Sequence, residues 1–322
     1  MDFAPSVYEH CARLIGRSPW DVSRDPALLF EAQAEAYRMY GHSPVVVGVD
    51  IYNLEAEAYG ATVGRPGGNG IPAVTEPLRS APEDISALPP FDPEGDGRIP
   101  MVMDVGCRLK SAFPQADVRV PVSGPFSIAA NLMGFEDLLC AAAIETVKTR
   151  DALLGLVDAQ VRFCEAVRRR GLDVAFFESA AAPPLLSPES FREIELPALT
   201  NMMNRAAVVL GHPLPCVIGG DTTPILPAIL ETGTMYVICP SETDQAAFLA
   251  IMRDRPDVTV RVNMSPAIVA GGTWARIRAE VDRILAMTRS RERACLGTGA
   301  LPYETPPENV LRIKDYIRTG QA

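Results

Sequence analysis

Residues 217–226 read Val-Ile-Gly-Gly-Asp-Thr-Thr-Pro-Ile-Leu, and this stretch decides the fold. A short apolar run leads into a glycine turn, which is followed by an acid, two hydroxyl residues and a proline that starts a helix. In α/β barrels the strands end in this way, and the loops after the strands carry the functional groups. The stretch therefore predicts a strand whose carboxyl end faces a ligand cleft.

Short apolar runs of the same kind recur between longer amphipathic segments. Their lack of polar alternation is typical of parallel strands that are covered on both faces. The runs are 45–49, 118–122, 174–177, 215–218, 235–238, 258–262 and 294–296. Helical patterns are predicted at 136–170 with Gly171 as the stop, behind Ser187 from Pro188 onward, and at 246–252 and 274–287. Alternation of strands and helices predicts a parallel sheet with right-handed crossovers.

Seven such strands favour an α/β fold with a single TIM-type (β/α)8 barrel over residues 1–322. A doubly wound dinucleotide-binding sheet would place GxGxxG after its first strand, but the chain has Asp50-Ile51-Tyr52-Asn53 there. No eighth strand is visible, because 1–33 reads as helix and loop. The barrel is therefore expected to be irregular at its first position, with 1–40 as an N-terminal helical extension. The Gly- and Pro-rich segment 64–100 is expected to be a long excursion over one barrel end, with an interdomain linker as the alternative.

The composition restricts the partners. The chain has 322 residues, a formal charge of −10, 48% hydrophobic and 22% charged residues, which disfavours nucleic acid and acidic membrane surfaces. No signal peptide is visible, and no apolar run approaches the roughly 18 residues of a membrane span. The seven cysteines are scattered and show no CxxC spacing, as expected in a reducing compartment. We therefore expect a cytoplasmic protein with a small-molecule substrate, and the oligomeric state stays open.

Polar residues at the predicted strand ends are the candidates for chemistry, because those positions reach the cleft of a barrel. Asp50, Glu178 and Asp221 are the expected catalytic residues, and burial behind an apolar strand should raise the pKa of Glu178. The expected substrate-binding residues are Asn53, Ser179, Gly219, Gly220, Thr222, Cys239, Asn263, Thr298 and Tyr303. Each has a structural alternative: Asp221 or Thr222 could cap the helix near Pro224, Glu178 could pair with an arginine, and Cys239 could be a packed thiol.

Several segments together resemble the uroporphyrinogen-decarboxylase superfamily. They are the run 45–50 with Glu55-Ala56-Glu57-Ala58-Tyr59-Gly60, then Ser123-Gly124-Pro125-Phe126-Ser127, Phe177-Glu178-Ser179, Gly220-Asp221-Thr222-Thr223-Pro224, Asn263 and Gly299-Ala300-Leu301-Pro302. They occur in family order over roughly residues 40 to 320. The resemblance implies a TIM barrel with its cleft at the carboxyl ends of the strands.

Two branches of that superfamily differ in the charged residues they need. The decarboxylase branch holds a polyanionic tetrapyrrole with an arginine-rich amino-terminal segment, since carboxylates call for cationic, bidentate partners. This chain has only Arg13 and Arg17 among its first twenty residues. Tetrapyrrole decarboxylation is therefore disfavoured, although Asp50 matches the acid that this branch places near the pyrroles.

The methyltransferase branch moves methyl groups between a corrinoid and an acceptor, and its thiol-alkylating members bind zinc through His-x-Cys and a later Cys. These positions fall on Val217, Gly219 and Ala300, or on Thr298 if the last loop is shifted. Strand alternation directs Val217 and Gly219 inward and Cys216 away, while His212 precedes the strand. The ligands have therefore not moved to neighbouring positions, and no metal site is expected.

The resemblance and the residues together predict methyl transfer between a corrinoid, either methylcobalamin or a corrinoid carrier protein, and a small acceptor or donor such as tetrahydrofolate. Asp50, Glu178, Asp221 and Asn263 would pair with the pterin ring in that hypothesis. A metal-free decarboxylase and a non-catalytic ligand-binding barrel are the alternatives.

Overall fold

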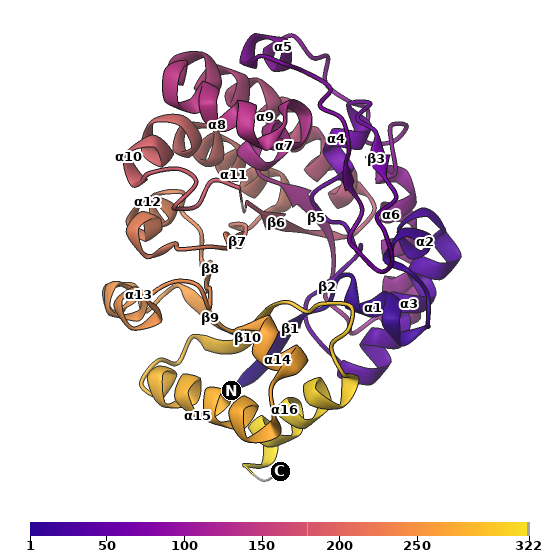
Figure 1. The fold of residues 1–322 in the computed structure, drawn as a ribbon, viewed down its shortest axis with the longest axis vertical. Coiled ribbons are helices and arrows are strands. Elements are labelled where there is room, and N and C mark those ends of the chain that lie inside the picture. The colour runs from indigo at the N-terminus through magenta and orange to yellow at the C-terminus, as the bar shows by residue number, and fades with distance from the viewer. Residues whose placement is uncertain (179, 321–322) are drawn as a thin grey trace.

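A parallel sheet of eight strands curls around the centre of the molecule (Figure 1). The computed structural model describes residues 1–178 and 180–320. In chain order the strands are β1 (Asp2–Ser6), β2 (Val45–Val46), β5 (Val118–Ser123), β6 (Asp173–Phe177), β7 (Cys216–Val217), β8 (Tyr236–Cys239), β9 (Thr259–Met264) and β10 (Ala294–Ala300). They are hydrogen-bonded in the order β1-β10-β9-β8-β7-β6-β5-β2. This arrangement confirms the predicted TIM-type fold.

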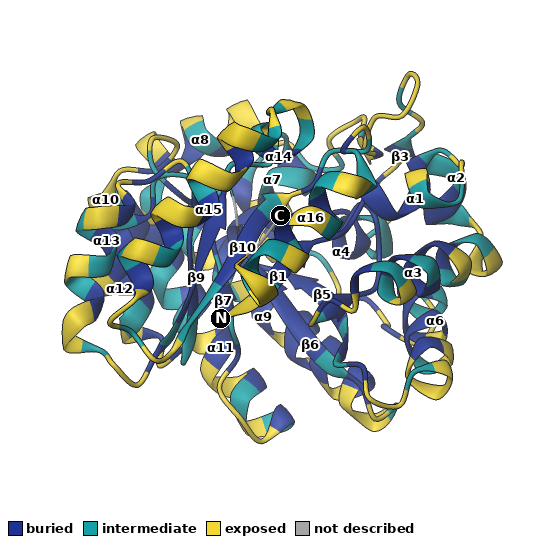
Figure 2. Ribbon diagram, turned by 90° about the horizontal axis from the view of Figure 1, so that it is seen from below, coloured by how far each residue is buried: buried dark blue, intermediate teal, exposed yellow. Residues whose placement is uncertain are grey.

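Helices surround the sheet and turn their exposed faces outward (Figure 2). The α-helices are α1 (His10–Leu14), α2 (Pro19–Arg24), α3 (Pro26–Tyr40), α4 (Leu54–Ala58), α5 (Pro82–Ser86), α6 (Ile99–Ala112), α7 (Pro125–Met133), α8 (Phe135–Ile144), α9 (Thr146–Arg169), α10 (Pro188–Ser190), α11 (Leu196–Leu210), α12 (Leu226–Glu231), α13 (Gln245–Ile251), α14 (Pro266–Gly271), α15 (Trp274–Thr288) and α16 (Pro307–Thr319). A π-helix (Phe191–Glu195) joins α10 to α11, and short 3-10 helices precede α12 (Thr223–Ile225) and follow α13 (Met252–Asp254).

The expectation of only helix and loop in the opening segment was wrong. β1 lies there and pairs in parallel with β10, with Phe3 opposite Leu296. Its sequence, Asp-Phe-Ala-Pro-Ser, has no β-branched run, so its pairing comes from tertiary context. The Ser6 backbone N–H donates to Thr298 Oγ1 at 3.1 Å and strengthens the join. β1 and β2 form the two ends of the hydrogen-bonded order, so the irregularity lies at this seam.

The alternation of side chains along each strand separates two cores. Val45, Val47 and Val49 pack into the large outer core between sheet and helices. Val46 points the other way and joins Tyr8, Ala175 and Phe177 in a small cluster inside the barrel. Because strand side chains alternate between faces, one run of apolar residues supplies both cores.

The single helix predicted for 136–170 is in fact two helices. Glu145, with φ −128° and ψ 43°, separates α8 from α9. The apolar pattern hides this break because Ile144 and Val147 are exposed on either side of it. The predicted stop at Gly171 is confirmed by its φ of +73°, and Ser187 caps α10 by accepting from the Ser190 N–H at 3.0 Å.

Segment 64–100 contains most of a small hairpin, the helix α5 and the first two residues of α6. The hairpin pairs β3 (Val63–Gly64) with β4 (Ala73–Val74) in antiparallel fashion. Just before β4, Ile71 and Pro72 reach the carboxyl ends of the barrel strands, where they border a cavity.

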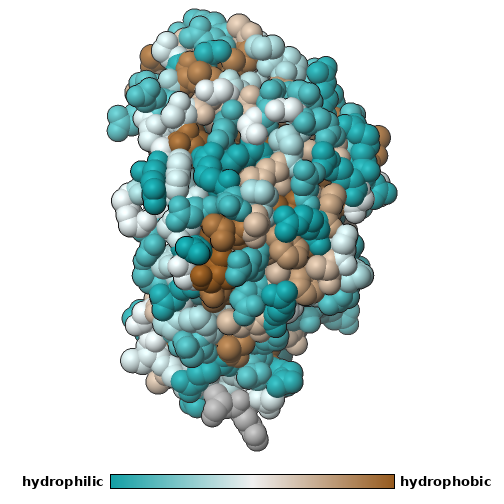
Figure 3. All heavy atoms as spheres, turned by 90° about the vertical axis from the view of Figure 1, so that its right-hand side faces the viewer, coloured by the Kyte–Doolittle hydropathy of each residue, from teal (hydrophilic) through white to brown (hydrophobic). Residues whose placement is uncertain are grey.

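The surface carries no extended apolar belt on the side shown in Figure 3, where hydrophobic residues gather only in small patches among hydrophilic ones. Within residues 1–178 and 180–320, no single helix is long and apolar enough to cross a membrane. Only α7 and α8 taken together pass that test, and they are bent by 115° at their junction.

Candidate functional site

A cavity of about 380 Å³ opens at the carboxyl ends of the strands. Its wall is largely apolar and aromatic, with Tyr8, Tyr52 and Phe177 prominent. The polar side chains in the wall come from different strand ends and are Ser6, Glu9, Asp50, Asn53, Glu242, Arg261 and Asn263. An apolar pocket with a few convergent polar groups is the usual form of a ligand site.

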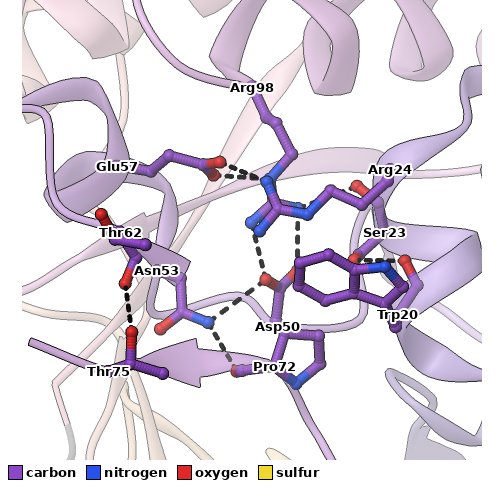
Figure 4. Close-up of polar contacts among 10 residues, drawn as sticks. All are labelled: Trp20, Ser23, Arg24, Asp50, Asn53, Glu57, Thr62, Pro72, Thr75 and Arg98. Carbon is purple, nitrogen blue, oxygen red and sulfur yellow. Dashed lines mark hydrogen bonds and ion pairs between the residues drawn. The ribbon is translucent and has the colours of Figure 1, made fainter. Parts of the chain in front are cut away.

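Asp50 is held by a buried arginine that the sequence did not single out (Figure 4). Arg98 donates from Nη1 to Asp50 Oδ1 at 3.0 Å and from Nη2 to Asp50 Oδ2 at 2.6 Å. Its Nε donates to Glu57 Oε2 at 2.5 Å, and Arg24 pairs with the other Glu57 oxygen. Burial alone would lower the pKa of Arg98, but the two carboxylates together raise it. This bidentate pair fixes the Asp50 side chain in the cavity wall.

Asn53 links the Asp50 cluster to the segment before β4. Its Nδ2 donates to Asp50 Oδ2 at 3.2 Å and to the Pro72 carbonyl at 2.7 Å (Figure 4). The side chain is buried and lines the cavity. Asn53 therefore orients Asp50 and also fixes one side of the cavity mouth.

Glu9 is the second carboxyl in the wall, and the sequence interpretation missed it. It follows β1, in a segment predicted to be helical, and its side chain is buried. Burial raises the pKa of Glu9 to about 7, and the charge of Glu304 contributes to the increase. A carboxyl with a pKa near neutrality can take up and release protons during a reaction. Its only sequence signal was an acid close to an unrecognised strand.

Glu178 does not reach the cavity, which corrects its predicted placement. Phe177 points into the barrel, so strand alternation turns Glu178 outward, where it is fully buried under α7. Its carboxylate accepts from the backbone N–H of Phe126 at 3.1 Å and of Ser127 at 3.3 Å, and from the Ser127 hydroxyl. A carboxylate is favourable at a helix N-terminus.

The predicted pKa increase of Glu178 is confirmed, since burial raises its pKa to about 7. Glu195, from the π-helix, lies beside it. Burial and the charge of Glu178 raise the pKa of Glu195 well above its usual range. At neutral pH Glu195 is therefore the protonated member of the pair. Both side chains are fully buried and lie outside the cavity wall.

The residues around 217 point alternately toward the cavity and toward the outer core, as strand alternation predicts. Val217, Gly219 and Gly220 line the cavity, while Cys216 packs in the outer core. Gly220 has a φ of +87°, which only glycine adopts without strain. The segment therefore forms part of the cavity wall, as predicted from its sequence.

Asp221 and Thr222 lie outside the cavity wall and do not cap the next helix. Asp221 Oδ1 accepts from the Thr243 hydroxyl at 2.7 Å. Thr222 is buried, makes no side-chain cap, and its Oγ1 lacks a hydrogen-bond partner among the described residues. Asp221 thus ties its loop to the loop after β8. The capping alternative is wrong, and the catalytic role of Asp221 stays a prediction for a residue outside the cavity wall.

Of the remaining predicted binding residues, some line the cavity and others lie outside its wall. Asn263 lines the cavity and, among the described residues, its Oδ1 has no hydrogen-bond partner. Cys239 packs in the outer core, where burial raises its thiol pKa, so the packed-thiol alternative fits. Thr298 binds Ser6 at the β1–β10 join, and Tyr303 packs against the outer core. Ser179 lies outside the described residues.

The three positions that would carry zinc ligands all border the cavity. Val217, Gly219 and Ala300 are wall residues, and none of them has a side-chain atom that can coordinate a metal. His212 lies at the opposite end of the barrel, exposed and 3.2 Å from Asp173. Over residues 1–178 and 180–320, no three His, Cys, Asp or Glu side chains are grouped closely enough to hold a metal ion. The residues present do not fit a zinc centre.

Comparison with known proteins agrees with this architecture. A methyltransferase from Methanosarcina mazei superposes with a TM-score of 0.81 at 20% sequence identity, over 98% of this chain and 93% of that one. A protein described as a deoxyribose-phosphate aldolase from Toxoplasma gondii covers 65% of this chain and 87% of its own at 13% identity, but its TM-score of 0.32 carries no argument. No curated protein sequence matches significantly. Residues 4–319 match the family described as uroporphyrinogen decarboxylase (URO-D). The chain belongs to the uroporphyrinogen decarboxylase family.

Proposed function

We propose that this protein transfers a methyl group between a corrinoid and a small acceptor held in the cavity, without zinc. The observation that carries the proposal is that Val217, Gly219 and Ala300 all line one cavity. The wall of this cavity has acidic side chains elsewhere, but these three positions offer no metal ligand. Membership of the family and the methyltransferase-like fold are consistent with it. The acceptor would then be activated by a carboxylate rather than by a metal.

The size of the cavity favours a small acceptor. Its volume of about 380 Å³ lies near the lower end of the usual range for ligand pockets, roughly 300–1,000 Å³. A corrin macrocycle does not fit inside such a space together with an acceptor. The corrinoid, free or on a carrier protein, is therefore proposed as a substrate that presents its methyl group at the mouth.

Glu9 is the group best suited to handle the proton. Arg98 engages both oxygens of Asp50, whereas Glu9 is buried in the wall with a pKa near neutrality. The acceptor heteroatom attacks the methyl carbon, the carbon–cobalt bonding pair stays with the corrinoid, and Glu9 takes the proton of the acceptor. Alignment in a closed cavity supplies most of the rate, because it converts an encounter into a positioned step.

Tetrahydrofolate remains one candidate acceptor or donor. Of the four residues expected to pair with its pterin ring, Asp50 and Asn263 lie in the wall, whereas Glu178 and Asp221 do not. Calorimetric titration of tetrahydrofolate into the wild type and into Asn263→Ala tests this candidate. The absence of binding to the wild type would remove it.

Decarboxylation is the second candidate, favoured by the position of Asp50 in the cavity wall. Against it, Arg261 is the one cationic side chain among the described residues that line the cavity. A tetrapyrrole with many carboxylates requires several cations for binding.

The deciding experiment measures the loss of methylcobalamin absorbance with the purified protein and a small acceptor, alongside uroporphyrinogen decarboxylation. Protein-dependent demethylation supports the proposal. Decarboxylation alone would support the second candidate, and ligand binding without either turnover would indicate a non-catalytic barrel.

A further inference from the structure

Arg261 occupies the middle of the barrel, between two cavities. It projects from β9 and lines both the cavity at the carboxyl ends of the strands, here the upper cavity, and a second one of about 900 Å³ at their amino ends, the lower cavity. Only 7% of the residue is exposed. The proposed methyl transfer assigns no role to this cation.

No carboxylate forms an ion pair with Arg261 within the part of the chain that the structure describes, and none acts on its pKa. The neighbours that act on it are Tyr236, Tyr8 and Cys295, and together they outweigh the effect of burial and keep its pKa high. Burial raises the pKa of each of these three groups above its usual value, so at neutral pH all three are uncharged. Arg261 Nε also lacks a hydrogen-bond partner in the described structure.

The other buried arginine in the described structure, Arg98, and the partly buried Arg119 are both paired. Arg98 binds Asp50 and Glu57, and Arg119 binds Asp117 and has Asp173 within 3.7 Å. A buried charge without a partner is costly, so proteins compensate buried charges with counter-ions or ligands. The contrast indicates that the counter-charge of Arg261 comes from outside the chain.

A glycine on the neighbouring strand makes room for the Arg261 side chain to reach the upper cavity. Gly297 on β10 lies opposite Asn263. A Cβ at Gly297 would lie 2.6 Å from Arg261 Cδ, 2.7 Å from its Cγ and 2.7 Å from Asn263 Oδ1. Because Gly297 has no Cβ, the Arg261 side chain can pack over it and extend along the barrel axis toward Asn263. Asn263 lines the upper cavity.

We propose that Arg261 binds the carboxylate of a small organic anion in the upper cavity, with the apolar body of that anion against the aromatic wall. A guanidinium matches a carboxylate through two parallel hydrogen bonds. Tyr8, Tyr52 and Phe177 provide the apolar contact surface for the body. This names the class of acceptor for the proposed function and rests on that function for the reaction, but the binding itself needs no corrinoid.

Matched neutral and anionic probes test the proposal. Benzoate and benzamide have nearly the same shape and differ in charge, and their dissociation constants are measured by NMR titration at neutral pH without methylcobalamin. The wild type is expected to bind benzoate at least tenfold more tightly than benzamide. Arg261→Gln should lose this preference, and Arg261→Lys should bind benzoate more weakly than wild type because an ammonium lacks the bidentate fork.

Arg119→Gln is the control, since Arg119 lines only the lower cavity and should leave the preference unchanged. Equal binding of the two probes to the wild type, or a preference that persists in Arg261→Gln, would overturn the proposal. So would benzoate affinity in Arg261→Lys equal to that of the wild type, or loss of the preference in Arg119→Gln, which would place the anion in the lower cavity. Because the binding assay contains no methyl donor, its outcome does not depend on the proposed methyl transfer. Anion binding by a protein that then shows no turnover when methylcobalamin is added would refute the proposed function and leave this inference intact.

Discussion

Two carboxyl groups in one cavity wall have opposite environments. Asp50 is hydrogen-bonded by Arg98 and Asn53, whereas burial dominates the environment of Glu9, which has no ion pair with a cation among the described residues. Two acids in different environments can divide the work of a site, and a carboxyl with a pKa near neutrality is suited to exchanging protons. At the scale of single residues, Glu9 is therefore the group to test first.

Glu9→Gln should gain stability relative to the wild type as the pH rises. The pKa of Glu9 is about 7 in the folded protein, above the ordinary carboxyl value of 4.5. The folded state therefore binds more protons, so its stability is greatest below pH 4.5 and falls as the pH rises through 7. Over that window the difference should approach about 3 kcal/mol. Urea unfolding of both proteins at pH 5 and pH 8 measures it, and a constant difference would show that Glu9 titrates normally.

Arg98 and Asp50 should behave as one energetic unit. Arg98→Met leaves Asp50 as a buried carboxylate without its cation and Glu57 with Arg24 alone, which is expected to cost about 3–5 kcal/mol of unfolding free energy. Adding Asp50→Asn should cost less than the sum of the two single changes, with a coupling of at least about 1 kcal/mol. Chemical denaturation of the four proteins gives the cycle. Additive effects would mean that the pair is not formed in solution.

At the scale of elements, Glu178 joins β6 to the start of α7. Gly124 makes this contact possible, because a Cβ there would lie 2.0 Å from Glu178 Oε2. The glycine in the motif at 123–127 and the acid after β6 are therefore two halves of one structural contact. Their shared occurrence in the sequence reflects packing between sheet and helix.

Gly124→Ala should lower stability by about 2 kcal/mol, since the added methyl group must displace a hydrogen-bonded carboxylate. Gly155→Ala is the matched control: Gly155 lies within α9, and its added Cβ would meet Ser86 Cα at an ordinary 3.7 Å. That change should be neutral or stabilise by up to about 1 kcal/mol, because alanine favours helix. Thermal unfolding compares the two, and similar effects at both sites would contradict the close contact at Gly124.

The same elements show what could be read from the sequence. Seven strands were predictable because each is a short, mostly apolar run between amphipathic segments, and alternation correctly separated Cys216 from Val217. Applied to Phe177, the same alternation would have turned Glu178 away from the cavity. β1 and Glu9 could not be found, since pairing with β10 rather than local preference makes that strand. Arg98 was missed because its partner Asp50 lies far away in the sequence. Arg261 was missed because only the folded barrel shows that it has no ion-pair partner among the described residues.

At the scale of the whole molecule, an acidic chain encloses a mainly apolar cavity with one uncompensated arginine. The net charge of −10 and the single cation in the described cavity wall make a polyanionic tetrapyrrole a poor occupant. A small anion at Arg261, a proton acceptor at Glu9 and a methyl donor at the mouth would instead use each of these features. Val217, Gly219 and Ala300 offer no metal-donor atoms, and we therefore propose that such a reaction proceeds without zinc.

The rate of methylcobalamin demethylation by protein dialysed against a strong chelator tests this account most directly. 4-Hydroxybenzoate, which joins a carboxylate to a methyl-accepting hydroxyl, and tetrahydrofolate serve as acceptors. The account predicts protein-dependent demethylation that is unchanged by chelation and falls at least tenfold in Glu9→Gln. Demethylation that stops after chelation and returns with added zinc, or no protein-dependent demethylation with either acceptor, would contradict it.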